Sequence, residues 1–167
     1  MRRVPLMILL ALGLAVPAGA YAFAGDADDG TLSVRHARGA VGLRVTGAII
    51  GHINHGRLSV KDPIIDDGTG PELWGCDHKR DLSDEVPDDV YLTCSGNDIR
   101  FRMAGGRYRL FVKGSGIALS VVGHGRVMLD GRGDDDADPD GGYSFNDEPY
   151  QSLPADPTLF SLAAPGS

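Results

Sequence analysis

Apolar and polar side chains alternate along most of this chain, and glycines interrupt the alternation at short intervals. The alternation is clearest in four segments, 41–45, 58–60, 99–103 and 108–112. A period of two buries one side of an extended strand and leaves the other side in water. No window carries apolar residues at helical spacing over two turns, and the 24 glycines disfavour long helices. The sequence therefore predicts an all-β domain.

Two architectures suit strands that glycines punctuate in this way. Short strands of about six residues joined by glycine turns predict a small antiparallel sandwich or barrel. Gly-x-Gly recurs every eight or nine residues, at 114–116, 123–125 and 131–133. This motif forms hairpin turns readily, because glycine accepts positive φ. The same recurrence would also mark successive corners of a short β-solenoid. We favour the sandwich or barrel and keep the solenoid as the alternative.

The first 24 residues have the pattern of a secretory signal peptide. Arg2 and Arg3 precede an apolar run, and the small residues that follow end in Ala22-Phe23-Ala24. An uncleaved N-terminal anchor is the alternative. We therefore expect a signal helix over 1–24, a polar lead over 25–30, one all-β domain over 31–162 and a loose tail over 163–167. The expected location is secreted, periplasmic or in the cell envelope.

Cys76 and Cys94 are the only cysteines. An exported chain with an even number of cysteines usually oxidises them, so we expect a disulfide between the two. They belong to a long excursion between predicted strands, and that excursion also contains Trp74. We expect this tryptophan to fill the core beside the disulfide; a ligand-stacking platform is the other interpretation.

The formal net charge of −7 at pH 7 disfavours nucleic acid and anionic lipid as partners. We expect no membrane contact beyond the signal segment. A basic cluster stands out against this background, and on alternating strands most of its members share one face. It could form a binding surface for an acidic cell-wall polymer, or it could pair with the protein's own aspartates. Its members are Arg100, Arg102, Arg107, Arg109 and Lys113.

An aspartate-rich segment resembles a calcium-binding loop in its spacing. Alternate carboxylates followed by a glycine turn can surround Ca²⁺ with oxygen ligands, so Ca²⁺ is a possible cofactor. Gly131 and Gly133 replace the expected preceding helix, Pro139 stiffens the loop, and a solvated acidic loop is the competing interpretation. The candidate ligands are Asp136, Asp138, Asp140, Ser144 and Asp147.

Other site chemistry is weakly indicated. His52 and His55 are three positions apart, so a regular strand would direct them to opposite faces, whereas a turn at Asn54 could bring them together around a metal. His124 lies between two glycines, which is typical of an exposed turn residue. No nucleophile elbow, zinc-protease motif or phosphate loop occurs. A carboxylate pair for glycoside hydrolysis cannot be located from one sequence.

Three segments carry a resemblance: 97–109, 114–127 and 142–145. Together they resemble a group of small exported bacterial β-rich proteins of unassigned function, over roughly 31–162. This resemblance implies an envelope or secreted β-domain and supplies no catalytic residues. We therefore expect a non-catalytic structural or binding module whose partner is a cell-wall or envelope component. The alternatives are a Ca²⁺-dependent binding domain and a small secreted hydrolase with paired carboxylates.

Overall fold

The computed structural model describes residues 28–62, 70–83, 90–133 and 141–166. No helix occurs in these ranges, so the all-β prediction is confirmed. The strands are β1 (Gly30–Asp62), β2 (Glu72–Trp74), β3 (His78–Asp81), β4 (Val90–Gly133), β5 (Gly142–Phe145), β6 (Gln151–Ser152) and β7 (Thr158–Leu162). The expected signal helix over 1–24 and the first half of the polar lead, 25–27, lie outside the described residues.

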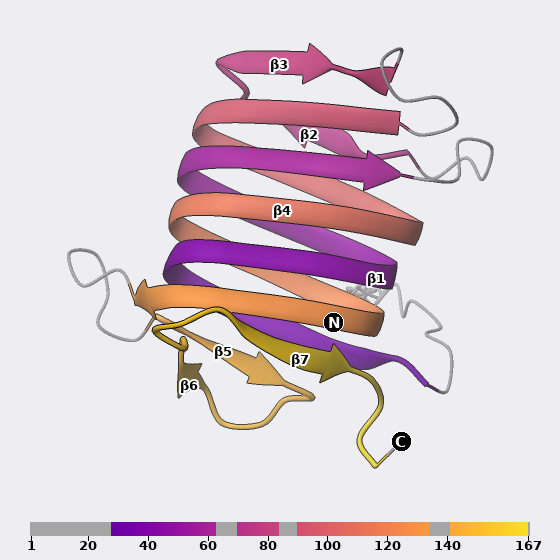
Figure 1. The fold of residues 1–167 in the computed structure, drawn as a ribbon, viewed down its shortest axis with the longest axis vertical. Helices are drawn as coiled ribbons and strands as arrows, with labels where there is room; N and C mark the ends of the chain where they lie inside the picture. Colours follow the sequence, from indigo (N-terminus) through magenta and orange to yellow (C-terminus); the bar gives the residue numbers. More distant parts are fainter. Residues whose placement is uncertain (1–27, 63–69, 84–89, 134–140, 167) are drawn as a thin grey trace, which may run out of the picture.

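Two long strands form most of the molecule by winding around each other (Figure 1). β1 has 33 residues, β4 has 44, and they pair in antiparallel orientation. β4 passes β1 on both sides: Val41 pairs with Val112 on one side and with Leu129 on the other. One turn of the coil therefore takes about 17 residues. The arrangement is a hairpin wound into a coil, with most of β1 held between two turns of β4 and its first residues held between β4 and β5.

Glycines stand where the coil bends. Gly56 pairs with Gly96 and Gly114, and Gly39 pairs with Gly114 and Gly131, so these five glycines form one stacked column. Gly39 has a φ of +145°, and a Cβ on it would lie 2.1 Å from the backbone oxygen of Asp130. Only glycine permits this backbone angle at this close approach. The Gly-x-Gly motifs are therefore corners, and the chain does not reverse at them.

The predicted architecture is right in its antiparallel pairing but wrong in how the strands are connected. Antiparallel pairing is confirmed, but the sheet does not close into a barrel. The expected short strands are segments of two continuous strands, because the glycines bend the chain without breaking the pairing. Successive turns stack as in the solenoid alternative (Figure 1). The difference from a simple solenoid is that neighbouring turns run in opposite directions.

Between its glycine corners the coil presents two outer faces. Face A crosses β3, β4, β1 and β7; one row of paired residues across it is Arg80, Thr93, Ser59, Phe111, Gly42, Met128 and Leu159. Face B crosses β2, β4, β1 and β5; one row across it is Glu72, Arg102, Ile50, Ser120, Ser33 and Ser144. Alternate residues of the same strands point inward and fill the coil.

The core lies inside the coil. Its largest fully buried side chains include Tyr108, Phe101 and Ile53, each at most 1% exposed. These positions have the parity that the alternating pattern assigned to the buried side of each strand. Burying such side chains contributes roughly 1.5–3 kcal/mol each, so the enclosed face dominates the stability of the coil.

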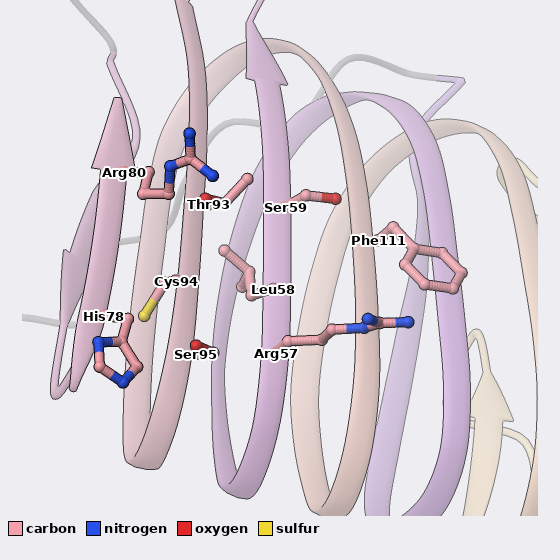
Figure 2. Close-up of a pocket in the computed structure, with 9 residues that line it drawn as sticks. All are labelled: Arg57, Leu58, Ser59, His78, Arg80, Thr93, Cys94, Ser95 and Phe111. Atoms are coloured by element: carbon pink, nitrogen blue, oxygen red, sulfur yellow. The ribbon is translucent and has the colours of Figure 1, made fainter. Parts of the chain in front are cut away.

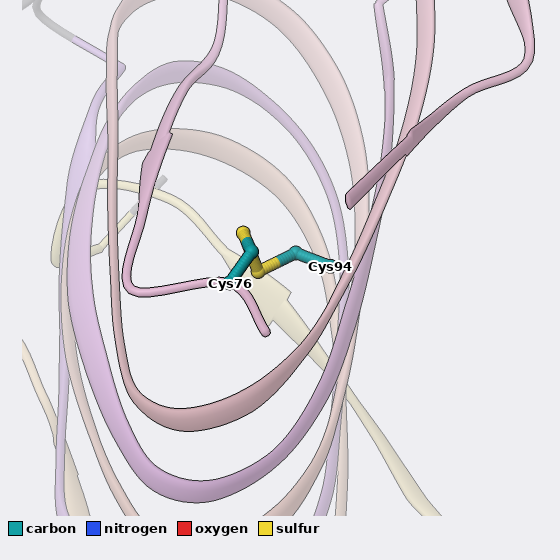
Figure 3. The surroundings of a disulfide bond; sticks show 2 residues. All are labelled: Cys76 and Cys94. Carbon is teal, nitrogen blue, oxygen red and sulfur yellow. A yellow bond between two sulfur atoms is a disulfide. The ribbon is translucent and has the colours of Figure 1, made fainter. Parts of the chain in front are cut away.

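A disulfide closes one end of the coil, and the predicted Cys76–Cys94 bond is confirmed. Figure 3 shows it within the outline of the turns. Cys94 is buried in β4, while Cys76 follows β2 and packs against the core. The prediction for Trp74 is wrong: this side chain is 51% exposed, because Leu73 takes the inward position of β2.

The other end is covered by β5, β6 and β7. The rings of Tyr143, Phe145 and Phe160 lie 5.4–5.7 Å apart between centroids and pack against the core. The Asn146 side chain accepts a hydrogen bond from the Thr31 backbone and donates one to the carbonyl of Ala163. β7 pairs with residues 125–129 of β4 and so covers part of an edge that would otherwise offer unpaired backbone groups.

Candidate functional site

Face A carries a row of cations in register across adjacent strands. Arg44 of β1 pairs with Arg109 and Arg126 of β4, and Arg109 also pairs with Lys61 of β1. Adjacent strands lie about 4.8 Å apart, so Lys61, Arg109, Arg44 and Arg126 form a line across the turns. We call this line the cation row. It runs along the coil axis, because each of its members comes from a different turn.

This arrangement costs stability. Like charges directly opposite each other on paired strands are destabilising, by up to about 1 kcal/mol per pair. Arg44, Arg109 and Arg126 are exposed, and within the described ranges none of the three makes an ion pair with an acidic side chain. The cation row therefore concentrates positive potential on a protein whose net charge is −7.

An apolar row lies beside the cation row. Phe111 is 39% exposed and Leu159 is 73% exposed, and Met128 lies between them across Gly42. A Cβ at Gly42 would be 3.2 Å from the Met128 methyl group, so the absence of a side chain leaves room for Met128. Face A thus offers apolar contact area directly next to positive charge.

A hollow extends face A toward β3. Its volume is about 370 Å³, and Figure 2 shows its lining residues on β3, β4 and β1. His78 and Arg80 come from β3, Arg57 from β1 and Phe111 from a second turn of β4. Arg57 also pairs across the strands with Lys113. Positive groups therefore lie on both sides of the apolar row.

The basic cluster expected from the sequence is divided between the two faces. Arg109 and Lys113 lie on face A, whereas Arg100 and Arg102 pair with β2 on face B. Arg107 follows the bend at Gly105 and Gly106, which separates the two pairs. Arg44, Arg126 and Lys61 are not among the residues predicted from the sequence. A usable signal exists: Arg44 and Lys61 are one turn apart in β1, as are Arg109 and Arg126 in β4.

Face B contains an open groove of about 860 Å³. Trp74 and Ile50 line it and are 51% and 60% exposed. Small residues, Gly51 and Ala118 among them, lie in its middle. The remaining lining residues are Ser33, Val34, Arg35, His52, Arg100, Phe101, Arg102, Leu119 and Ser120.

Polar and cation–π contacts fix the side chains at the ends of this groove. His52 Nε2 lies 2.8 Å from Asp98 Oδ1, and the Arg100 guanidinium lies 3.2 Å from the other Asp98 oxygen. The hydrogen bond from His52, with the charge of Arg100 as a smaller cause, holds the pKa of Asp98 below its usual value. At the opposite end, the Arg35 guanidinium stacks on the Tyr150 ring at 4.3 Å from its centroid.

Three of the histidines contact neighbouring polar side chains. His55 Nδ1 lies 2.8 Å from Asn97 Oδ1, so His52 and His55 have separate partners. His124, at its glycine corner, is partly buried and lies 2.8 Å from Asp29 Oδ1. Among the described residues no group of three His, Cys, Asp or Glu side chains is arranged to hold a metal ion.

The expected calcium loop is only partly described. Asp136, Asp138 and Asp140 lie outside the described residues. The Ser144 hydroxyl donates to the Glu148 carbonyl at 2.5 Å and is buried with its residue, while Asp147 is exposed with a φ of +59°. Ser144 thus has an internal role in the turn after β5.

No family model, curated protein or solved structure matches the chain. Within the described residues, no helix has the length and apolar character needed to span a membrane.

Proposed function

We propose that this protein is an exported, non-catalytic binding module of the cell envelope or secreted space, and that it holds a linear acidic polymer along the cation row. The single observation that carries the proposal is the register of Lys61, Arg109, Arg44 and Arg126. A fold that places like charges opposite one another bears a cost that a bound polyanion would remove.

The geometry of the row favours a polymer of acidic sugars. Cations repeat about every 4.8 Å along the axis, and a pyranose ring advances a polysaccharide by a similar distance. A chain with one carboxylate on each ring can therefore meet successive cations. The apolar row gives the faces of the sugar rings a surface to pack on, with Phe111 as its aromatic member. Export is supported by the N-terminal sequence pattern, and the disulfide is compatible with an oxidising compartment.

Binding of polygalacturonate to the purified protein, followed by titration calorimetry, tests the proposal. We expect binding that weakens steeply with salt, because neutralised charges release counterions. The Arg44→Gln/Arg126→Gln double variant should lose roughly tenfold or more in affinity, on the usual magnitude for charge-assisted hydrogen bonds. It should also show a shallower salt dependence.

The matched control is Arg100→Gln/Arg102→Gln, which removes the same charge from face B. This control should bind nearly as wild type. Equal losses in both double variants would show that only overall charge matters and would overturn the assignment to face A. Equal binding to neutral dextran, or binding to anionic vesicles without binding to the polymer, would also contradict the proposal.

A further inference from the structure

The groove on face B differs chemically from face A. Its exposed members Trp74 and Ile50 are large and apolar, and buried Phe101 and Leu119 lie beneath its middle. Sites for small molecules are commonly concave surfaces that apolar and aromatic side chains line beside a few polar groups. A volume near 860 Å³ also lies within the usual range for small-molecule sites.

A cation stands beside this apolar surface. Arg102 pairs in register with Ile50, and it is exposed. Its cross-strand neighbour on the other side is Glu72, but the two do not form an ion pair, and no ion pair of Arg102 occurs within the described segments. Arg100 has Asp98 as its partner and Arg35 has the Tyr150 ring. Among the described residues, Arg102 is therefore the guanidinium of the groove with neither an acidic nor an aromatic partner, so it can bind an anionic ligand without giving up an existing contact.

We propose that the groove binds a single-chain anionic amphiphile. Its anionic head lies at Arg102, and its apolar chain crosses Ile50, Gly51 and Ala118. The small side chain of Ala118, which pairs across the strands with His52, leaves the middle of the groove open for the chain. The space of the missing Gly51 side chain lies on the inner side and is filled by the buried Phe101 ring. Trp74 borders the head-group end, because it pairs with Arg100 on the neighbouring strand. This site is separate from the cation row, and its existence does not depend on polymer binding.

Trp74 is the only tryptophan, so its fluorescence reports on the groove alone. The probe is decanoate below its micelle concentration, with acetate and decyltrimethylammonium as comparison ligands. We expect decanoate to give a saturable change in Trp74 emission. Acetate should give none, because it lacks the chain, and the cationic amphiphile should bind at least about tenfold more weakly, because it lacks the charge-assisted bond. Calorimetry provides the affinity independently of fluorescence.

Substitutions at two exposed positions separate the contributions that the head group and the apolar chain of the ligand make to binding. Arg102→Gln should weaken decanoate about tenfold and remove the preference over decyltrimethylammonium. Ile50→Ser should weaken both amphiphiles, because less apolar surface is buried. The matched control is Lys79→Gln on β3, which removes one positive charge outside the groove and should bind as wild type.

The proposal is overturned if decanoate and decyltrimethylammonium bind equally to the wild-type protein. It is also overturned if Lys79→Gln and Arg102→Gln weaken decanoate to the same extent, or if an acidic oligosaccharide changes Trp74 emission while decanoate does not. Loss of polygalacturonate binding in the Arg44→Gln/Arg126→Gln variant does not bear on this site, so the two proposals fail independently.

Discussion

At the scale of single residues, the coil depends on glycines that are not equivalent. Gly39 combines positive φ with a backbone oxygen 2.1 Å from where a Cβ would lie. Gly105 has a φ of +134° but nothing within 4 Å of its Cβ position. Gly42 does not have a positive φ, and its nearest neighbour is the flexible end of Met128. A side chain would therefore meet a backbone clash as well as strain at Gly39, backbone strain alone at Gly105, and only a movable side chain at Gly42.

Alanine substitutions should therefore rank in a fixed order. Gly39→Ala should lower the free energy of unfolding by more than about 3 kcal/mol, because strain and a clash with backbone add. Gly105→Ala should cost about 1–3 kcal/mol from strain alone. Gly42→Ala should stay within about 1 kcal/mol of wild type, because the Met128 side chain can move. Urea unfolding measures all three, and equal costs at Gly39 and Gly42 would contradict the stacked-corner geometry.

Asp98 also has a residue-scale consequence. Its pKa is lowered mainly by the hydrogen bond from His52. A lowered carboxylate pKa contributes stability that is present above the ordinary value of 3.8 and is lost as the pH falls through the lowered folded pKa. Asp98 is exposed to solvent, so its contribution to stability is small.

The pKa itself is the better measurement. A carboxyl-carbon NMR titration should show Asp98 titrating below 3.8, and His52→Ala should raise that pKa toward 3.8. Arg100→Gln should raise it less, because the guanidinium is the smaller cause. A larger effect of Arg100→Gln than of His52→Ala would show that the hydrogen bond is not the main cause.

At the scale of elements, the disulfide ties the segment between β2 and β3 to β4. The two cysteines are 18 residues apart, and cross-linking a loop of this length stabilises by about 3 kcal/mol in the chain-entropy model. Buried Cys94 also belongs to the core. The bond therefore both closes a loop and covers one end of the coil.

Removing the bond should lower stability without changing the coil. The Cys76→Ser/Cys94→Ser variant should lose about 2–4 kcal/mol of unfolding free energy. The wild-type protein in reductant should lose a similar amount, while reductant should leave the double variant unchanged. An unchanged unfolding midpoint in the double variant would contradict a structural role for the disulfide.

At the scale of the whole molecule, the sequence predicts the strands better than their connections. Period-two alternation correctly places Tyr108 and Phe101 inside, because parity alone decides which side of a strand is buried. It does not settle β2, where Leu73 and Trp74 are adjacent apolar residues and only one can point inward.

The pairing is harder to infer, because most β1 residues have two β4 partners about 17 positions apart. A glycine at a bend and a glycine in a hairpin turn look alike in sequence, since both need positive φ. The cation row escaped prediction for the same reason: its members are distant in sequence and meet only when the register is known. Arg100 and Arg109, close in sequence, end on different faces.

The two-sided pairing of β1 is the claim on which both faces depend, and through-space NMR tests it most directly. We expect inter-strand backbone NOEs from Leu43 to both Leu110 and Val127. We expect a second such set from Ile49 to both Met103 and Val121. Contacts to only one β4 partner at each position would indicate an ordinary hairpin or meander and would contradict the coil.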